Sequence, residues 1–250
     1  ASAWRAVPSA AFLNTHTRHM RLSFTLALLL AAPAALAQSP SFGLKAGLNV
    51  STLLFEDEVL FEDDEIGKDP RLGFVGGVTA DIPFTPMLGL RAEALYSQKG
   101  FATTVDFEEG PGGEPFSGSQ ILELDYLEVP LLARVAIPLQ DGLTVDVLAG
   151  PAPAFLLSDG FSCGGDYNDF GEFDEACDGS NVEDEESVFE SFNLGGVLGL
   201  SVGAGAFSVD ARYTYGFSNV IKDVAFDDDV TDRSTKNSVF SFTAAYRFGG

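Results

Sequence analysis

The sequence has 250 residues, a length that suits one large β-domain or two average domains. Its 14 Lys and Arg against 37 Asp and Glu give a net charge of −23. Such an acidic excess repels nucleic acid, so we expect no nucleic-acid partner. The two histidines, His16 and His19, precede the expected mature chain, which therefore lacks Ser–His–Asp and Cys–His catalytic arrangements.

Residues 20–37 have the pattern of a secretory signal peptide. Met20 and Arg21 form a short positive start, an apolar stretch follows, and the Ala-Leu-Ala sequence at 35–37 suits a cleavage site. The apolar stretch is shorter than the roughly 20 residues that a spanning helix needs. Residues 1–19 precede this complete signal, and we expect them to be a non-native upstream extension. Residues 38–250 are then one exported domain, with a buried N-terminal helix as the alternative reading of the start.

Stretches of roughly ten residues with period-two hydrophobicity follow one another from Phe42 onward, as in the strands of a membrane barrel. In residues 207–218 the alternate positions separate completely into an apolar and a polar set, as they do only in a strand. The sequence predicts strands at 42–51, 71–82, 88–100, 120–138, 143–157, 188–202, 207–218 and 237–248.

The connections between these segments alternate between long and short. The long ones are 52–70, 101–119, 158–187 and 219–236, and they hold 28 of the 37 acidic residues. The short ones are 83–87, 139–142 and 203–206, with Asp141 as their one acid. An even strand number with this alternation is typical of outer-membrane barrels, whose external loops are long and whose periplasmic turns are short. The predicted fold is all-β: an eight-stranded antiparallel up-and-down transmembrane β-barrel.

Charged residues inside the predicted strands fall on the polar face. Seven cations and seven anions share this face, and charges confined in a narrow barrel must find partners. Eight strands leave an interior that side chains just fill, so we expect a filled lumen with an ion-pair network. Its predicted members are Lys45, Arg71, Asp81, Arg91, Glu93, Lys99, Glu123, Asp125, Glu128, Arg134, Asp146, Asp210, Arg212 and Arg247.

Residues 122–135 change their alternation once. Leu122, Leu124 and Tyr126 share one parity, after which the apolar set moves to the odd positions. A β-bulge near Tyr126 would restore the register. This reading keeps Glu123 and Asp125 on the lumen side together with the later charges.

Three stretches resemble a known family. The sequence LDYLEVPLLARV at 124–135 resembles the characteristic strand of the PorT-like outer-membrane β-barrel family. FGLKAGLNVSTL at 42–53 is similar to its first strand and GLRAEALYSQKG at 89–100 to its third. The resemblance implies an eight-stranded barrel in the bacterial outer membrane. The founding member is associated with protein secretion and gliding, whereas most relatives have no defined role.

The longest loop carries the candidates for covalent and metal chemistry. Cys163 and Cys177 are the only cysteines, and in an exported protein they predict a disulfide, with two free thiols as the alternative. Oxygen ligands in calcium-like spacing are weak candidates for a calcium site, because the positions that an EF-hand needs are incomplete. They are Asp166, Asn168, Asp169, Glu172 and Asp174, and the alternative is a solvated acidic loop or a saline habitat. No other cofactor is expected.

These patterns predict an integral outer-membrane protein that is structural or adhesive and not an enzyme. Its expected partners are outer-membrane lipid and an extracellular or envelope protein bound through the loops. One alternative is an accessory of protein secretion or envelope assembly, and another is an outer-membrane lipid enzyme. A third is a soluble secreted β-barrel whose apolar face points inward and binds a ligand.

Overall fold

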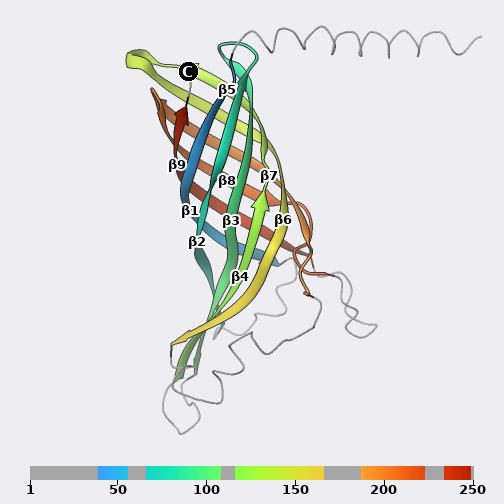
Figure 1. Cartoon of the computed structure of the whole chain (residues 1–250). Coiled ribbons are helices and arrows are strands. Elements are labelled where there is room, and N and C mark those ends of the chain that lie inside the picture. Colours follow the sequence, from blue (N-terminus) through green and yellow to red (C-terminus); the bar gives the residue numbers. More distant parts are fainter. Residues whose placement is uncertain (1–38, 56–65, 108–115, 166–186, 223–233, 249–250) are drawn as a thin grey trace, which may run out of the picture.

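The computed structural model describes residues 39–55, 66–107, 116–165, 187–222 and 234–248 (Figure 1). These residues form one antiparallel sheet, which is rolled up into a barrel. Its strands are β1 (Ser41–Phe55), β2 (Ile66–Pro83), β3 (Leu88–Phe107), β4 (Phe116–Glu128), β5 (Leu131–Pro138), β6 (Leu143–Gly165), β7 (Phe192–Ala204), β8 (Phe207–Gly216) and β9 (Thr235–Phe248). Within these residues no helix is long and apolar enough to cross a membrane.

The sheet closes on itself as a ring of eight. β4 and β5 are consecutive parts of one wall strand, interrupted at residues 129–130, where Pro130 has no amide hydrogen to donate. β1 pairs with β9 along its whole length, from Phe42 opposite Phe248 to Phe55 opposite Thr235. This pairing removes both sheet edges. The eight-stranded antiparallel up-and-down barrel that the sequence predicts is therefore confirmed.

The two faces of the wall have opposite polarity. Large apolar side chains on the outer face are exposed in most strands, whereas the buried face carries lysines, arginines, carboxylates and hydroxyl groups. A soluble ligand-binding barrel requires the reverse arrangement, so that alternative is wrong. The outward set includes Leu44, Leu48, Phe74, Val78, Leu131, Val135, Leu194, Leu198, Leu200, Val209, Phe240 and Phe242.

The two ends of the barrel differ in construction. At one end short turns join the strands at residues 84–87, 139–142 and 205–206. Asp141, Gly142 and Gly205 take positive φ there, as tight turns require. At the other end β3, β4 and β6 run well past the ring (Figure 1). We call these ends the turn side and the loop side.

The strands on the loop side are longer than the sequence pattern predicts. β3 continues to Phe107 and β6 to Gly165, and the three strands stay paired there, with Phe107 opposite Phe116 and Gly118 opposite Gly165. β7 begins only at Phe192 and β8 ends at Gly216. The wall is therefore high along β3, β4 and β6 and low along β7 and β8.

Candidate functional site

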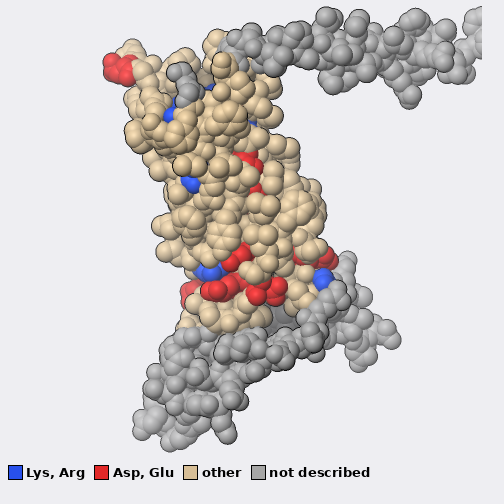
Figure 2. All heavy atoms as spheres, in the orientation of Figure 1, with Lys and Arg blue, Asp and Glu red and all other residues tan. Residues whose placement is uncertain are grey.

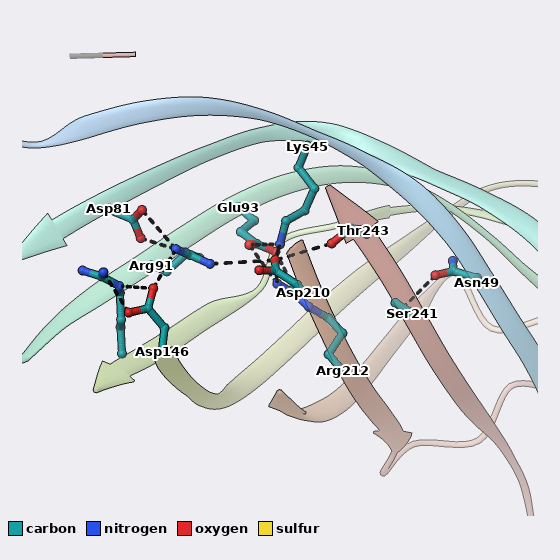
Figure 3. Close-up of polar contacts among 11 residues, drawn as sticks. Lys45, Asn49, Asp81, Arg91, Glu93, Asp146, Asp210, Arg212, Ser241 and Thr243 are labelled. Carbon is teal, nitrogen blue, oxygen red and sulfur yellow. Dashed lines mark hydrogen bonds and ion pairs between the residues drawn. The ribbon is translucent and has the colours of Figure 1, made fainter. Parts of the chain in front are cut away.

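The centre of the lumen is an ion-pair layer built around Glu93 (Figure 3). Lys45 Nζ lies 2.8 Å from Glu93 Oε1, and Arg212 Nη1 lies 2.7 Å from Glu93 Oε2. Asp210 pairs with the same two cations, at 3.1 Å from Arg212 Nη2. These side chains come from β1, β3 and β8, and all four are almost completely shielded from solvent.

Arg91 extends this layer toward the turn side. Its guanidinium donates two hydrogen bonds to Asp81, at 2.7 and 3.1 Å, and lies 3.6 Å from Asp146 and 3.8 Å from Asp210. Arg134 forms a second two-bond pair with Asp146, at 2.8 and 2.9 Å. Four cations thus face four anions in the layer, and their formal charges cancel. The members of this ion-pair layer are Lys45, Asp81, Arg91, Glu93, Arg134, Asp146, Asp210 and Arg212.

Neutral polar groups continue the layer along β9 and β1. Thr243 Oγ1 donates to Asp210 Oδ2 at 3.4 Å, and Ser241 Oγ donates to Asn49 Oδ1 at 2.7 Å. The Asn49 amide donates in turn to Ser97 Oγ at 3.0 Å. Hydrogen bonds of this kind offset the desolvation of buried polar groups. The charged centre is therefore embedded in a polar wall.

The loop-side part of the lumen contains an apolar cluster beside the buried polar side chains of Asn193, Thr235 and Asn237. Lys99 marks the boundary: its Nζ is 2.7 Å from Glu128 Oε2 and 5.2 Å from the centre of the Tyr126 ring, a cation–π distance. Next to this pair lies a cluster of buried apolar side chains. We call it the apolar layer, and it consists of Leu53, Leu122, Leu124, Tyr126, Ala154, Phe189 and Val220.

Glu123 and Asp125 lie on the opposite face from the one we expected. Between residues 122 and 136 the even-numbered side chains point inward without a change of parity, so Leu122, Leu124 and Tyr126 line the lumen. The extra residue is Leu157 on β6, because Asp125 pairs with Ser158 and Tyr126 with Leu156. The bulge thus belongs to the neighbouring strand.

The outer face of the high wall explains this difference. Glu123 is 46% exposed and lies 3.2 Å from Arg71, and Asp125 accepts a 2.6 Å hydrogen bond from the Tyr96 hydroxyl. A strand that continues past a membrane meets water outside, so its outer face is polar and its inner face is free to be apolar. The sequence pattern does not reveal where the membrane stops.

The other predicted network members are placed as follows. Arg71, Lys99 and Glu128 form ion pairs outside the central layer. Arg247 lies at the turn side, where its guanidinium donates to the Gly205 carbonyl at 3.1 Å. Neither Arg247 nor Asp125 joins any ion pair found among the described residues.

Residues that the sequence reasoning missed lie in the apolar layer. Phe189 falls inside the predicted strand 188–202, but β7 begins only at Phe192. Val220 falls in a predicted connection. Both side chains are buried, with 4% and 0% of their surface exposed. An apolar residue close to an acidic run is the one available signal, and that signal does not distinguish a strand residue from a loop residue.

The disulfide and calcium predictions fall on the longest loop. Cys177 and the candidate ligands Asp166, Asn168, Asp169, Glu172 and Asp174 lie outside the described residues, as do residues 1–38. Both predictions therefore stay predictions. In the part of the chain that the structure describes, no group of three or more His, Cys, Asp or Glu side chains could hold a metal ion.

Known outer-membrane proteins are similar to this chain. The model of a family described as outer membrane protein beta-barrel domain matches residues 36–222. No curated protein matches the chain. Similar solved structures are the attachment invasion locus protein Ail of Yersinia pestis (16% identity, 84% of this chain and 100% of that chain, TM-score 0.37) and Neisserial surface protein A (15%, 84% and 100%, TM-score 0.41). Outer membrane protein OprG of Pseudomonas aeruginosa is similar at 13% identity, covering 85% of this chain and 98% of that chain, with a TM-score of 0.35.

Proposed function

Because the chain belongs to the outer membrane protein beta-barrel domain family, we propose that it is a sealed barrel that acts by binding a partner at its loop side. The protein is located in the bacterial outer membrane, and its exposed apolar belt faces lipid. The turn side then faces the periplasm and the loop side the exterior. This arrangement supports a structural or adhesive role at the cell surface.

The filled lumen supports the first part of the proposal, which is that the barrel is sealed. The ion-pair layer and the apolar layer are stacked along the barrel, and their side chains are buried. An eight-stranded barrel is only just wide enough for such side chains, so little room is left for a column of water. This filling supports a barrel that does not conduct solutes.

The same filling supports the proposal that the protein is not an enzyme. A catalytic carboxylate needs access to a substrate and a proton to exchange. In the buried ion-pair layer Glu93 is instead held by two cations and Asp210 by three. Their role is to neutralise buried cations.

The acidic residues of the long connections support the second part, which is that a partner binds at the loop side. The long connections hold 28 of the 37 acids, and in Figure 2 red carboxylates of the described residues gather toward this end. A field of one sign raises the association rate of oppositely charged partners. We therefore propose that the partner presents a basic surface.

A second candidate function is an accessory role in protein secretion or envelope assembly. The specific observation behind it is the resemblance of residues 124–135 to the characteristic PorT-like strand. The family match is to the general barrel domain, so the narrower assignment remains a proposal.

Two measurements on the full chain in lipid membranes test the proposal. In a planar bilayer the protein should give no steps of open-pore size. Vesicles carrying it should bind a lysine-rich peptide in a salt-sensitive way, and binding should weaken when Glu183, Asp184, Glu185 and Glu186 are replaced by their amides. Steady pore conductance would refute the sealed lumen, and peptide binding unchanged by the four substitutions would refute the loop-side partner site.

A further inference from the structure

The turn side of the barrel is almost free of charge. Residues 82–90, 137–145 and 202–209 contain one charged residue, Asp141, whereas charged residues make up 20% of the whole chain. Turns that stand in water are usually rich in polar residues such as Asn, Asp and Ser. This end instead exposes large apolar side chains, among them Met87 at 51% and Leu139 at 50%. We call these exposed residues the turn patch, and they are Phe84, Met87, Leu88, Ile137, Leu139, Leu143 and Phe207.

Backbone contacts hold the three turns side by side. The Ala136 amide of β5 donates to the Met87 carbonyl at 2.7 Å, so the first turn lies against the strand that leads into the second. Leu143, which begins β6, pairs with Ala204, which ends β7, so the second turn lies next to the third. The turn patch is therefore one surface at the turn side (Figure 1).

The turn patch is continuous with the apolar belt that faces lipid. Side chains two residues apart on a strand share a face. Ile137 follows Val135 on β5 and Phe207 precedes Val209 on β8, and these side chains are all exposed. In Figure 2 the turn-side part of the molecule is mostly tan. A contiguous exposed apolar surface marks an interaction or membrane site, and continuity with the belt indicates that lipid covers this one.

The apolar belt alone is long enough to cross the hydrocarbon of the membrane. Its loop-side limit on the β4–β5 wall strand lies between Leu127 and the outward carboxylate of Asp125. Residues 127–137 provide eleven positions, and about 9–11 tilted residues suffice for a crossing. Leu139 lies two positions farther, within the headgroup zone of about 5–7 Å. Asp141, the one charge, follows at the tip of the turn, where water begins.

We propose that the turn patch is seated in the headgroup zone of the inner leaflet, with glycerophospholipid as its partner. This zone accepts apolar side chains and also offers hydrogen-bond partners to the turn backbones, which hydrocarbon does not. The placement fixes the depth of the barrel. Outward movement would draw Asp141 toward hydrocarbon, and inward movement would do the same to Asp125. The inference concerns the turn side alone and does not depend on what the loop side binds.

A single tryptophan in the turn patch tests this depth. Trp4 is the only tryptophan of the chain, so Trp4→Phe gives a silent background. Met87→Trp is added to this full-length chain, which is folded into vesicles of phospholipids brominated at either end of the acyl chain. Bromine near the headgroup should reduce the fluorescence at least about twofold, because an interfacial side chain lies at the boundary between headgroups and acyl chains. Bromine near the chain end should reduce it less.

Two controls calibrate the depth. Leu198→Trp, in the middle of β7 on the belt, should be quenched most by bromine near the chain end. Ser162→Trp should not be quenched by either lipid. Ser162 pairs with Ile121 on the high wall, beyond the loop-side limit of the belt.

Leu139→Trp repeats the measurement on the second turn, in case Met87→Trp does not fold. Gel mobility of unboiled samples checks the folding of each variant. Fluorescence as unquenched as that of Ser162→Trp would place the turns in water and overturn the proposal. Quenching strongest by bromine near the chain end would place the turn patch in hydrocarbon, which overturns it equally.

Discussion

Glu93 shows how a buried charge shapes this protein at the residue scale. Removing a carboxylate from water is costly, and the cost is offset only when cations and hydrogen-bond donors surround it closely. Lys45 and Arg212 do this for Glu93 at 2.8 and 2.7 Å. In return Glu93 neutralises both cations in the buried interior. The three residues form a unit, and none of them could be buried alone.

Replacing Glu93 by glutamine should strongly destabilise the barrel. The amide retains the shape but leaves two buried cations short of one negative charge. We expect a loss of about 3–5 kcal/mol in the free energy of unfolding, as for other broken buried pairs. Urea unfolding in lipid vesicles, followed by tyrosine fluorescence, measures it.

Glu123→Gln is the matched control for this substitution. Glu123 also pairs with an arginine, Arg71 at 3.2 Å, but its side chain is 46% exposed. Water screens such a pair, so the expected loss is at most about 1 kcal/mol. Similar losses in both variants would show that the ion-pair layer is hydrated, contrary to the packing described above.

At the scale of the strand, the polarity of the outward side chains indicates where the membrane ends. On β7 the outward side chains Leu194, Leu198 and Leu200 are apolar and exposed. On the loop-side parts of β4 and β6 the outward positions are Glu123, Asp125 and Ser158. The hydrocarbon belt therefore stops on this wall near the bulge, and the strands beyond it stand in water.

An arginine on the outer face should report this boundary. Leu198→Arg, at a side chain that is 63% exposed in the middle of β7, should cost about 2–4 kcal/mol, because a guanidinium enters hydrocarbon. Ser158→Arg, above the boundary, should change the free energy of unfolding by less than about 0.5 kcal/mol. Folding in vesicles measures both, and an equal cost would place Ser158 within the belt.

Glycines at close strand contacts give a second prediction at this scale. A Cβ added at Gly47 of β1 would lie 2.0 Å from the Phe242 carbonyl oxygen of β9, a distance that real atoms do not reach. Gly47→Ala should therefore force the strands apart and cost about 1–3 kcal/mol. Gly160→Ala is the control, since a Cβ there meets nothing within 4 Å. Thermal unfolding in detergent separates the two, and equal melting temperatures would contradict the close β1–β9 approach.

At the scale of the whole molecule, stability depends on closure of the ring. The β1–β9 pairing joins the two ends of the sheet over fourteen residue pairs, from Phe42 opposite Phe248 to Phe55 opposite Thr235. Once this seam is closed, every wall strand has two neighbours, and the backbone has no free edge in lipid. The two filled layers then support the wall from inside.

The closed ring should make the protein heat-modifiable on gels. Unboiled samples should migrate faster than boiled ones, because detergent alone does not unzip a closed barrel. Ala244→Pro, in the β9 segment that pairs with both β1 and β8, should abolish the fast band, since proline removes an amide donor from the closing strands. A fast band that survives this substitution would mean that the seam can open without loss of the barrel.

The core of the ion-pair layer could be predicted from the sequence, whereas its limits could not. Alternation places Lys45, Glu93 and Arg212 on the polar face, and the structure puts them in contact. Asp125 follows the same reasoning and yet lies on the outer face. The alternation repeats every two residues along the whole strand and contains no mark for the point at which lipid gives way to water.

The sequence by itself determined the strand number, the alternation of long and short connections and the separation of each strand into an apolar and a polar face, because all three follow from local periodicity and composition. Only the tertiary structure decided which charges meet, which strand carries the bulge, and that residues 188–190 pair with residues 220–222. These depend on register between strands and on pairings such as that of Phe189 with Ile221, which are remote in sequence. Local pattern determines which side chains of a strand share a face, and closure of the barrel determines what that face contacts.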